Sequence, residues 1–396
     1  MARSGPLVAL LAAVLLAGCT HVEETFIPPL PQTTGRVDSG LGQGTRALSS
    51  GPGYKGLPAW NHDGNRIAFT KDGYVMDAPT TSQESRRWTT KDFVATDTEW
   101  TSEETLTILG TTSPTGRGAD NSLYRANAGG GSLALKRIAG GVLAMSPIAE
   151  EDDLLFALAT GPHGSELAHT RDGETSYKTY ADNRIDGHVS ALALSPGGEE
   201  AVMSVRPRGD SRTSELRTFD LRRKEGRKVA RLEGDREIVG TPQWMQQSIY
   251  FVAGKQTTSL NSVSSEPLFE LYRVPTDGGA PEPAPGVGED FVASSTRVSP
   301  QGDRLAVIGR LNPKSPINLY VLDPAKKKLE AVTSNEDMEI KTDPGDLAWS
   351  PDGKSIAIVA RGTPSTKPEV RTEPANRLLR DFYNLYEIPV LEETSR

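Results

Sequence analysis

Five histidines are the side chains in this sequence that most readily bind metal ions or move protons. Only His163 and His169 lie close together, and their spacing matches no helical zinc motif. If Ser165 to Thr170 form a strand, these two residues lie on the same side of the chain but far apart. The sequence therefore predicts histidines in loops and at strand edges rather than a metal site. The full set is His21, His62, His163, His169 and His188.

Carboxylates are the second set of side chains that could do chemistry. Four of them follow one another from Glu150 to Asp153, but this run lacks the spaced Asp, Asn and Gly ligands of a calcium loop. A solvated turn is the simpler interpretation. Gly110 to Gly116 encloses five residues and is followed by Arg117, so it is not a phosphate-binding loop of the Walker type. No motif predicts a catalytic residue, a metal ion or a cofactor.

Cys19 is the only cysteine, which excludes an intramolecular disulfide and a cysteine-based metal cage. Arg3 precedes an apolar run from Leu7 to Leu16, and Ala17 and Gly18 come directly before the cysteine. These residues resemble the bacterial lipoprotein signal, which implies a signal peptide over residues 1–18 and lipid attachment to Cys19. The apolar run is too short to span a membrane. The alternatives are an ordinary secretory signal or an N-terminal anchor.

The residue after the cysteine bears on the choice of membrane. Thr20 stands where some bacterial lipoproteins carry an Asp that holds them at the inner membrane. The resemblance therefore favours the outer membrane of a cell envelope. The formal net charge of −8 gives no electrostatic reason to expect a nucleic-acid partner.

Residues 19–55 are rich in Pro, Gly, Thr and Ser, as in Ile27 to Pro31. This composition buries little apolar surface and predicts an extended tether between the lipid and the body. An irregular strap packed on the body is the alternative for its second half. Arg46 to Ser50 would then supply the outermost strand of the last blade and close the ring.

One pattern recurs along the rest of the chain. It consists of a short strand, a turn such as Ser350 to Gly353, and a second strand with alternating apolar residues. The equivalent positions are spaced by 40, 45, 49, 50, 54 and 51 residues, which is the period of propeller blades. These positions are Trp60, Trp100, Met145, Leu194, Trp244, Val298 and Trp349.

Most copies continue with a third and a weaker fourth strand, for example Leu216 to Phe219 and Val229 to Leu232. A single four-stranded sheet cannot bury both of its faces, so such sheets stack radially until the ring closes. The sequence therefore predicts an all-β fold over residues 56–396. The expected architecture is a seven-bladed β-propeller of four-stranded antiparallel sheets, with six or eight blades as alternatives. The tryptophans are expected between the blades.

The stretch from Trp349 to Gly353, followed by an apolar strand and by Asn384-Leu385-Tyr386, resembles the repeats of the TolB-type propellers. These are related to WD-repeat propellers and to the propeller domains of prolyl-oligopeptidase-like enzymes. The resemblance covers roughly residues 56–390 and implies the fold, not an activity. TolB has an α/β domain ahead of six blades, which this chain lacks, and no Gly-x-Ser-x-Gly motif of a hydrolase is present.

The connections between second and third strands are long and should emerge on one face, where recognition is commonly located. The longest joins Arg361 to Phe382 and carries the predicted partner-binding residues, which are Arg377, Arg380, Phe382 and Tyr383. A short helix over Pro374 to Phe382 would present them. A solvated insertion without a partner is the alternative.

The sequence favours a lipid-anchored propeller of the cell envelope that works as a protein-binding or assembly scaffold. Its partner would be an envelope protein, and Cys19 would supply the membrane contact. The alternative is an enzyme acting on a small molecule or glycan, with carboxylates in the channel. That enzyme would need Asp97 and Asp346, which lie just ahead of first strands.

Overall fold

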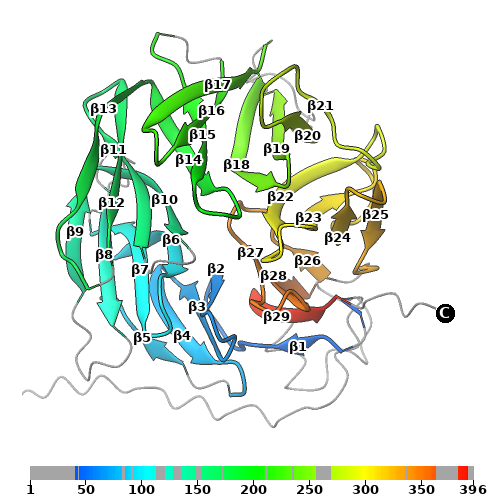
Figure 1. The fold of residues 1–396 in the computed structure, drawn as a ribbon. Helices are drawn as coiled ribbons and strands as arrows, with labels where there is room; N and C mark the ends of the chain where they lie inside the picture. Colours follow the sequence, from blue (N-terminus) through cyan, green and yellow to red (C-terminus); the bar gives the residue numbers. More distant parts are fainter. Residues whose placement is uncertain are drawn as a thin grey trace, which may run out of the picture.

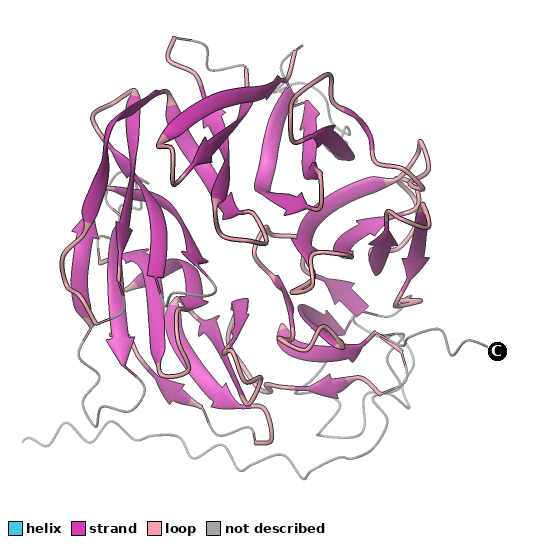
Figure 2. Ribbon diagram, viewed as in Figure 1, coloured by secondary structure: helices cyan, strands magenta, loops and turns pink. Residues whose placement is uncertain are grey.

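Seven antiparallel sheets surround a central channel, as Figures 1 and 2 show. The computed structural model describes residues 41–42, 44–82, 85–90, 93–112, 121–127, 135–148, 153–171, 173–209, 213–233, 236–255, 269–335, 338–362 and 382–390. The prediction of a seven-bladed β-propeller built from four-stranded antiparallel sheets is confirmed. No helix occurs in these ranges, and hence none that is long and apolar enough to cross a membrane.

Blades one to six each consist of four consecutive strands, counted from the channel outward. Blades one to three are β2 (Lys55–Trp60), β3 (Arg66–Lys71), β4 (Tyr74–Pro79), β5 (Arg86–Arg87); β6 (Val94–Trp100), β7 (Thr105–Thr111), β8 (Ser122–Asn127), β9 (Lys136–Gly140); and β10 (Val142–Ile148), β11 (Asp153–Ala159), β12 (Gly164–Thr170), β13 (Lys178–Asp186). Blades four to six are β14 (His188–Leu194), β15 (Glu200–Arg206), β16 (Glu215–Asp220), β17 (Glu225–Arg231); β18 (Arg236–Met245), β19 (Ser248–Lys255), β20 (Phe269–Pro275), β21 (Glu282–Pro283); and β22 (Val292–Val298), β23 (Leu305–Arg310), β24 (Asn318–Asp323), β25 (Lys328–Ala331).

Blade seven combines the two ends of the described chain. Its inner strand is split into β26 (Met338–Ile340) and β27 (Leu347–Trp349), which both pair with β28 (Ser355–Gly362). The next strand, β29 (Asn384–Pro389), pairs with β1 (Arg46–Ala47) through Arg46 opposite Glu387 and Ala47 opposite Tyr386. Figure 1 shows the N-terminal strand beside the C-terminal one. The ring is therefore closed by a strand from the N-terminal segment.

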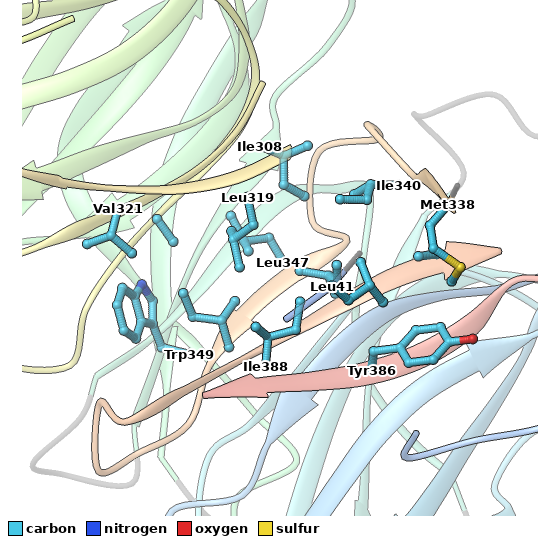
Figure 3. Packing of buried hydrophobic residues seen from close by; sticks show 14 residues of the cluster. Leu41, Ile308, Leu319, Val321, Met338, Ile340, Leu347, Trp349, Tyr386 and Ile388 are labelled. Atoms are coloured by element: carbon cyan, nitrogen blue, oxygen red, sulfur yellow. The ribbon is translucent and has the colours of Figure 1, made fainter. Parts of the chain in front are cut away.

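Two leucines fix this N-terminal segment to the ring. Leu41 is fully buried in an apolar cluster with Leu347, Met338 and Tyr386 between blades six and seven, as Figure 3 shows. Leu48 is buried in a second cluster that joins blades seven and one. Each fully buried leucine contributes about 1.5–3 kcal/mol relative to an exposed one. The closing strand is short and forms few backbone hydrogen bonds. Burial of these two leucines therefore adds stability that the hydrogen bonds alone do not provide.

Lys55 forms a polar contact at the same seam. Its side chain is almost fully buried, and Nζ donates hydrogen bonds to the carbonyl oxygen of Gly51 at 2.8 Å and to Asn384 Oδ1 at 3.1 Å. It also donates to the carbonyl oxygen of Tyr383 at 3.1 Å. Burial, together with the nearby charge of Lys71, lowers the pKa of Lys55 to about 8. One lysine of blade one thus holds both the strap before β2 and the start of β29.

The inner strands share an irregularity that decides which side chains enter the channel. In blades one to six the register between the first and second strands shifts once, for example between Ala95 and Asp97 and between Ala293 and Ser295. Blade seven has a complete break from Lys341 to Asp346 at the corresponding place. Such bulges redirect the side chains that follow them.

The inner-strand tryptophans lie between blades, as the repeat predicts. Trp100 and Trp349 are buried, and each indole nitrogen donates to a carbonyl oxygen on the inner strand of the preceding blade. The acceptors are Ala59, at 3.1 Å, and Arg297, at 2.9 Å. These two hydrogen bonds stabilise the stacking of blades, and Trp349 also lines the channel together with Trp60 and Trp244.

Candidate functional site

The first candidate is the face where the second-to-third strand connections emerge, which we call the loop face. In an antiparallel blade the start of the first strand and the end of the second lie at this same face. Among the described residues, four large apolar side chains are exposed, and three of them are here: Tyr54 before β2, Val94 at the start of β6 and Leu311 after β23. The fourth, Tyr177, lies in a third-to-fourth strand connection at the opposite face.

Two of the four predicted partner-binding residues lie at the start of β29 on this face. Phe382 and Tyr383 are half-buried, whereas Arg377 and Arg380, like the expected helix up to residue 381, lie outside the described residues. The ring of Tyr383 packs edge-on against Tyr54 with centroids 5.4 Å apart. Tyr383 thus contributes to the seam between blades seven and one, and Tyr54 is the more exposed of the pair.

The Tyr383 side chain is held by charged neighbours. Its hydroxyl donates to the Glu339 carboxylate, which also accepts a hydrogen bond from Arg361 Nε at 2.8 Å. The Arg361 guanidinium lies 4.8 Å from the Tyr383 ring centroid. Burial and the Glu339 carboxylate raise the pKa of Tyr383 to about 12. The phenol is therefore a fixed hydrogen-bond donor and not a proton acceptor at neutral pH.

A second group on the loop face comes from the break in the inner strand of blade seven. Lys341 Nζ lies 4.3 Å from the Tyr54 ring centroid and pairs with Asp346 Oδ2 at 2.6 Å and Asp343 Oδ2 at 3.1 Å. The backbone nitrogen of Leu57 donates to Asp346 Oδ1 at 2.8 Å. Sequence reasoning missed Lys341 and Asp343, although the insertion that carries them is peculiar to the seventh repeat.

Asp346 does not have the position that the enzyme alternative requires. It is buried beside Lys341 and is not among the residues that line the channel cavity. Burial raises its pKa, and the Lys341 contact partly offsets that rise. The enzyme alternative needs both Asp97 and Asp346 in the channel, and Asp346 does not meet this requirement, because the strand break turns its side chain into the seam with blade one.

The central channel is the second candidate site. It contains a cavity of about 990 Å³ lined by the inner strands of all seven blades. This volume is at the upper end of the range for small-molecule sites, about 300–1,000 Å³. The charged side chains that line it include Asp97 and Glu99 from β6 and Arg297 from β22.

An ion pair crosses the channel between blades two and six. Arg297 Nη2 lies 2.5 Å from Glu99 Oε1, and 198 residues separate the two in sequence. The Glu99 charge raises the pKa of Arg297 against the cost of burial. This pair ties opposite walls of the channel and restricts passage through it.

Asp97 lies two residues before Glu99, on the same side of β6. Its Oδ1 accepts a hydrogen bond from the Thr98 backbone nitrogen at 2.9 Å. Desolvation, followed by repulsion from Glu99, raises the pKa of Asp97 to about 7. The side chain therefore exchanges a proton near neutral pH, a property often found at functional sites. Carboxylates on the same side of one strand do not flank a glycosidic bond as an acid and base must.

The other residues considered in the sequence do not come together. His169 lies in β12 and lines the cavity, whereas His163 lies in the turn before that strand. Of the acidic run only Asp153 is described; it is buried at the start of β11, 3.9 Å from Arg171 Nε. Within the part of the chain that the structure describes, no three His, Cys, Asp or Glu side chains are placed to hold a metal ion.

Comparison with known proteins supports the fold and nothing narrower. Neither a protein-family model nor a curated protein sequence matches the chain. Among solved structures, an oligogalacturonate lyase from Vibrio parahaemolyticus is similar, with a TM-score of 0.55 and 10% identity over 88% of this chain and 94% of that one. The β-propeller domain of Cps50 (Swd1) from Myceliophteria thermophila has a TM-score of 0.52 and 13% identity over 88% and 100%.

TolB is also among these structural neighbours. TolB from Acinetobacter baumannii has a TM-score of 0.43 and 12% identity over 82% of this chain and 77% of that one. At such identities the likeness extends to the β-propeller fold alone.

We expect Asp97→Asn to stabilise the protein more at neutral than at acidic pH. The folded-state pKa of about 7 lies above the ordinary value of 3.8, so the stability that protonated Asp97 contributes is fully present below 3.8 and is lost as the pH rises through 7. Asn keeps an acceptor for Thr98 and carries no charge. The expected gain in unfolding free energy is about 1–2 kcal/mol at roughly pH 8 and near zero at roughly pH 4.

Urea denaturation at the two pH values measures this difference. Asp277→Asn, in an exposed turn between β20 and β21, is the matched control and should show no such pH dependence. An equal gain from Asp97→Asn at both pH values would contradict the placement of the proton on Asp97.

Proposed function

We propose that this protein is a lipid-anchored β-propeller of the cell envelope that binds another envelope protein through its loop face. The observation that carries the proposal is the placement of Tyr54, Val94 and Leu311, three of the four exposed large apolar side chains of the described residues, on that one face. Aromatic and aliphatic side chains surrounded by polar groups are the usual anchors of protein interfaces.

The seam between blades seven and one supports this role. Tyr54 is 54% exposed, yet its ring is fixed by the Lys341 ammonium on one side and by the Tyr383 ring on another. A preorganised aromatic side chain loses little conformational entropy when a partner binds. Arg377 and Arg380 precede β29 by a few residues, and we assign them to the same contact surface.

The position of β1 supports the proposed anchoring. With lipid on Cys19, a chain of about twenty residues joins the membrane to Leu41, where the described strap begins to pack on blades six and seven. An extended chain of that length spans up to about 70 Å. We propose that a tether of this length leaves the loop face free for a partner away from the membrane. The outer membrane remains the favoured location because of Thr20.

A channel ligand is the second candidate function. Asp97 and Glu99 project into a cavity of about 990 Å³, and some propellers of similar fold are enzymes. Asp346, which a reaction across the channel would need, is buried in an ion pair instead, although Asp153, Glu199 and Glu237 also line the cavity. We therefore rank a small-molecule or glycan-active enzyme below a protein-binding scaffold.

Photo-crosslinking in native membranes tests the loop face. A photoreactive residue in place of Leu311 or Val94 should crosslink to the same envelope protein, identified by mass spectrometry, because both positions are exposed on that face. Tyr177, exposed on the opposite face, is the matched control and should give no such product. Equal crosslinking from all three positions would exclude a specific loop-face interface. If Arg380→Glu with Phe382→Ala leaves the crosslinks intact, the connection before β29 takes no part.

Cys19→Ser tests the anchor separately. Without the thiol that accepts lipid, we expect the protein to move from the membrane fraction to the soluble fraction, whereas Thr20→Ser should remain with the membrane. Fractionation followed by immunoblotting measures the distribution. Retention of the Cys19→Ser variant in the membrane fraction would mean that another segment holds the protein there.

A further inference from the structure

Blade four differs in charge from the rest of the protein. Residues 188–232 contain ten Lys or Arg and six Asp or Glu, although the whole chain has a net charge of −8. Several of these cations lie on β17 and in the turn before it, at the outer edge of the ring. The side chains of Arg222, Arg223 and Lys228 are 76%, 79% and 54% exposed. This edge lies across the ring from β1 (Figure 1).

A groove of about 330 Å³ lies beside this edge, between blades three and four. Its floor is apolar and consists of Leu167 and Ile185 from blade three and Met203 and Phe219 from blade four. Three cationic side chains and one carboxylate lie on its walls, and Arg227 borders it without directing its guanidinium into it. The wall residues are Arg184, Arg217, Arg227, Lys228 and Glu215.

The single carboxylate does not neutralise these walls. Glu215 lies 2.7 Å from Arg217 Nη2 and 3.8 Å from Lys228 Nζ. Among the described residues, no carboxylate lies within ion-pairing distance of Arg184. The Arg227 guanidinium is turned away from the groove, because its Nη2 donates to the carbonyl oxygen of Thr276 in blade five at 2.5 Å. The cations Arg184, Arg217 and Lys228 therefore outnumber the single carboxylate above an apolar floor.

Gly226 keeps the groove open. A Cβ built on this residue would lie 3.5 Å from Phe219 Cδ2 and 3.6 Å from the Thr218 carbonyl oxygen, at ordinary contact distance. Its backbone belongs to the extended strand β17 and does not require glycine. Basic residues on an edge strand also prevent pairing with other chains, but that role does not explain a groove with an apolar floor.

We propose that the groove between blades three and four binds an acidic protein segment that places one apolar side chain on the Phe219 floor. The cations of the walls match carboxylates along such a segment, and the floor matches an aliphatic or aromatic side chain. A flat anionic membrane reaches the exposed cations but not the recessed floor. This surface is separate from the loop face, so it stands or falls independently of the partner proposed above.

The test uses residues 19–396 carrying Cys19→Ser and a short fluorescein-labelled peptide of Glu residues around one Phe. Fluorescence anisotropy should show binding that weakens with salt, with Gln in place of the Glu residues, and with Ala in place of the Phe. Arg184→Gln with Lys228→Gln should weaken binding about tenfold. The matched control is Lys326→Gln with Lys328→Gln, exposed cations of blade six, which should leave the affinity unchanged.

Gly226→Ile tests the floor without removing charge. A β-branched residue suits the strand, so the melting temperature should not fall, while the added side chain fills the groove and abolishes binding. Unchanged peptide binding by Gly226→Ile, or an equal loss in the blade-six control, would overturn the proposal. If phosphatidylglycerol vesicles bind and lose binding in Gly226→Ile, the surface belongs to a lipid instead. If the protein self-associates without peptide and the same variants abolish this, the surface belongs to a second copy of the chain.

Discussion

The pairing of β1 with β29 is the contact on which the ring depends. Each blade buries its faces against its neighbours, so an incomplete seventh blade would leave apolar surface exposed on blades six and one. Only Arg46 and Ala47 form the closing strand, but Leu41 and Leu48 add buried apolar contacts on either side. Lys55 then connects the strap to the start of β29. Closure therefore results from a few backbone hydrogen bonds supported by side chains of both chain ends.

The closed ring gives its two faces and its channel different properties. The break between β26 and β27 places Lys341 under the Tyr54 ring, so the seam that closes the ring also shapes the loop face. In the channel, the Glu99–Arg297 ion pair fixes opposite walls, and Asp97 beside it retains a proton near neutrality. A tether attached through the closing strand would hold the ring without occupying either site.

The repeat predicted the architecture because one turn pattern recurs at near-constant spacing, and all seven aligned positions, Trp60 to Trp349, fall in innermost strands. Contacts between blades could not be predicted in the same way. Glu99 and Arg297 are joined by ring geometry over 198 residues, and no local pattern marks such a pair. The position of Asp346 could not be predicted either, because the inner strand of blade seven is broken just before β27. The charged insertion from Lys341 to Asp346 was the available signal.

The central claim is that the N-terminal strap closes the ring, and two truncations test it most directly. A chain that begins at Leu41 keeps every described contact of the strap, whereas a chain that begins at Lys55 loses β1, Leu41 and Leu48. In thermal unfolding, the chain that begins at Leu41 should have the same melting temperature as the mature protein. The second should melt at a clearly lower temperature, since loss of two buried leucines alone removes about 3–6 kcal/mol. Equal melting temperatures for the two truncations would contradict closure by the N-terminal segment.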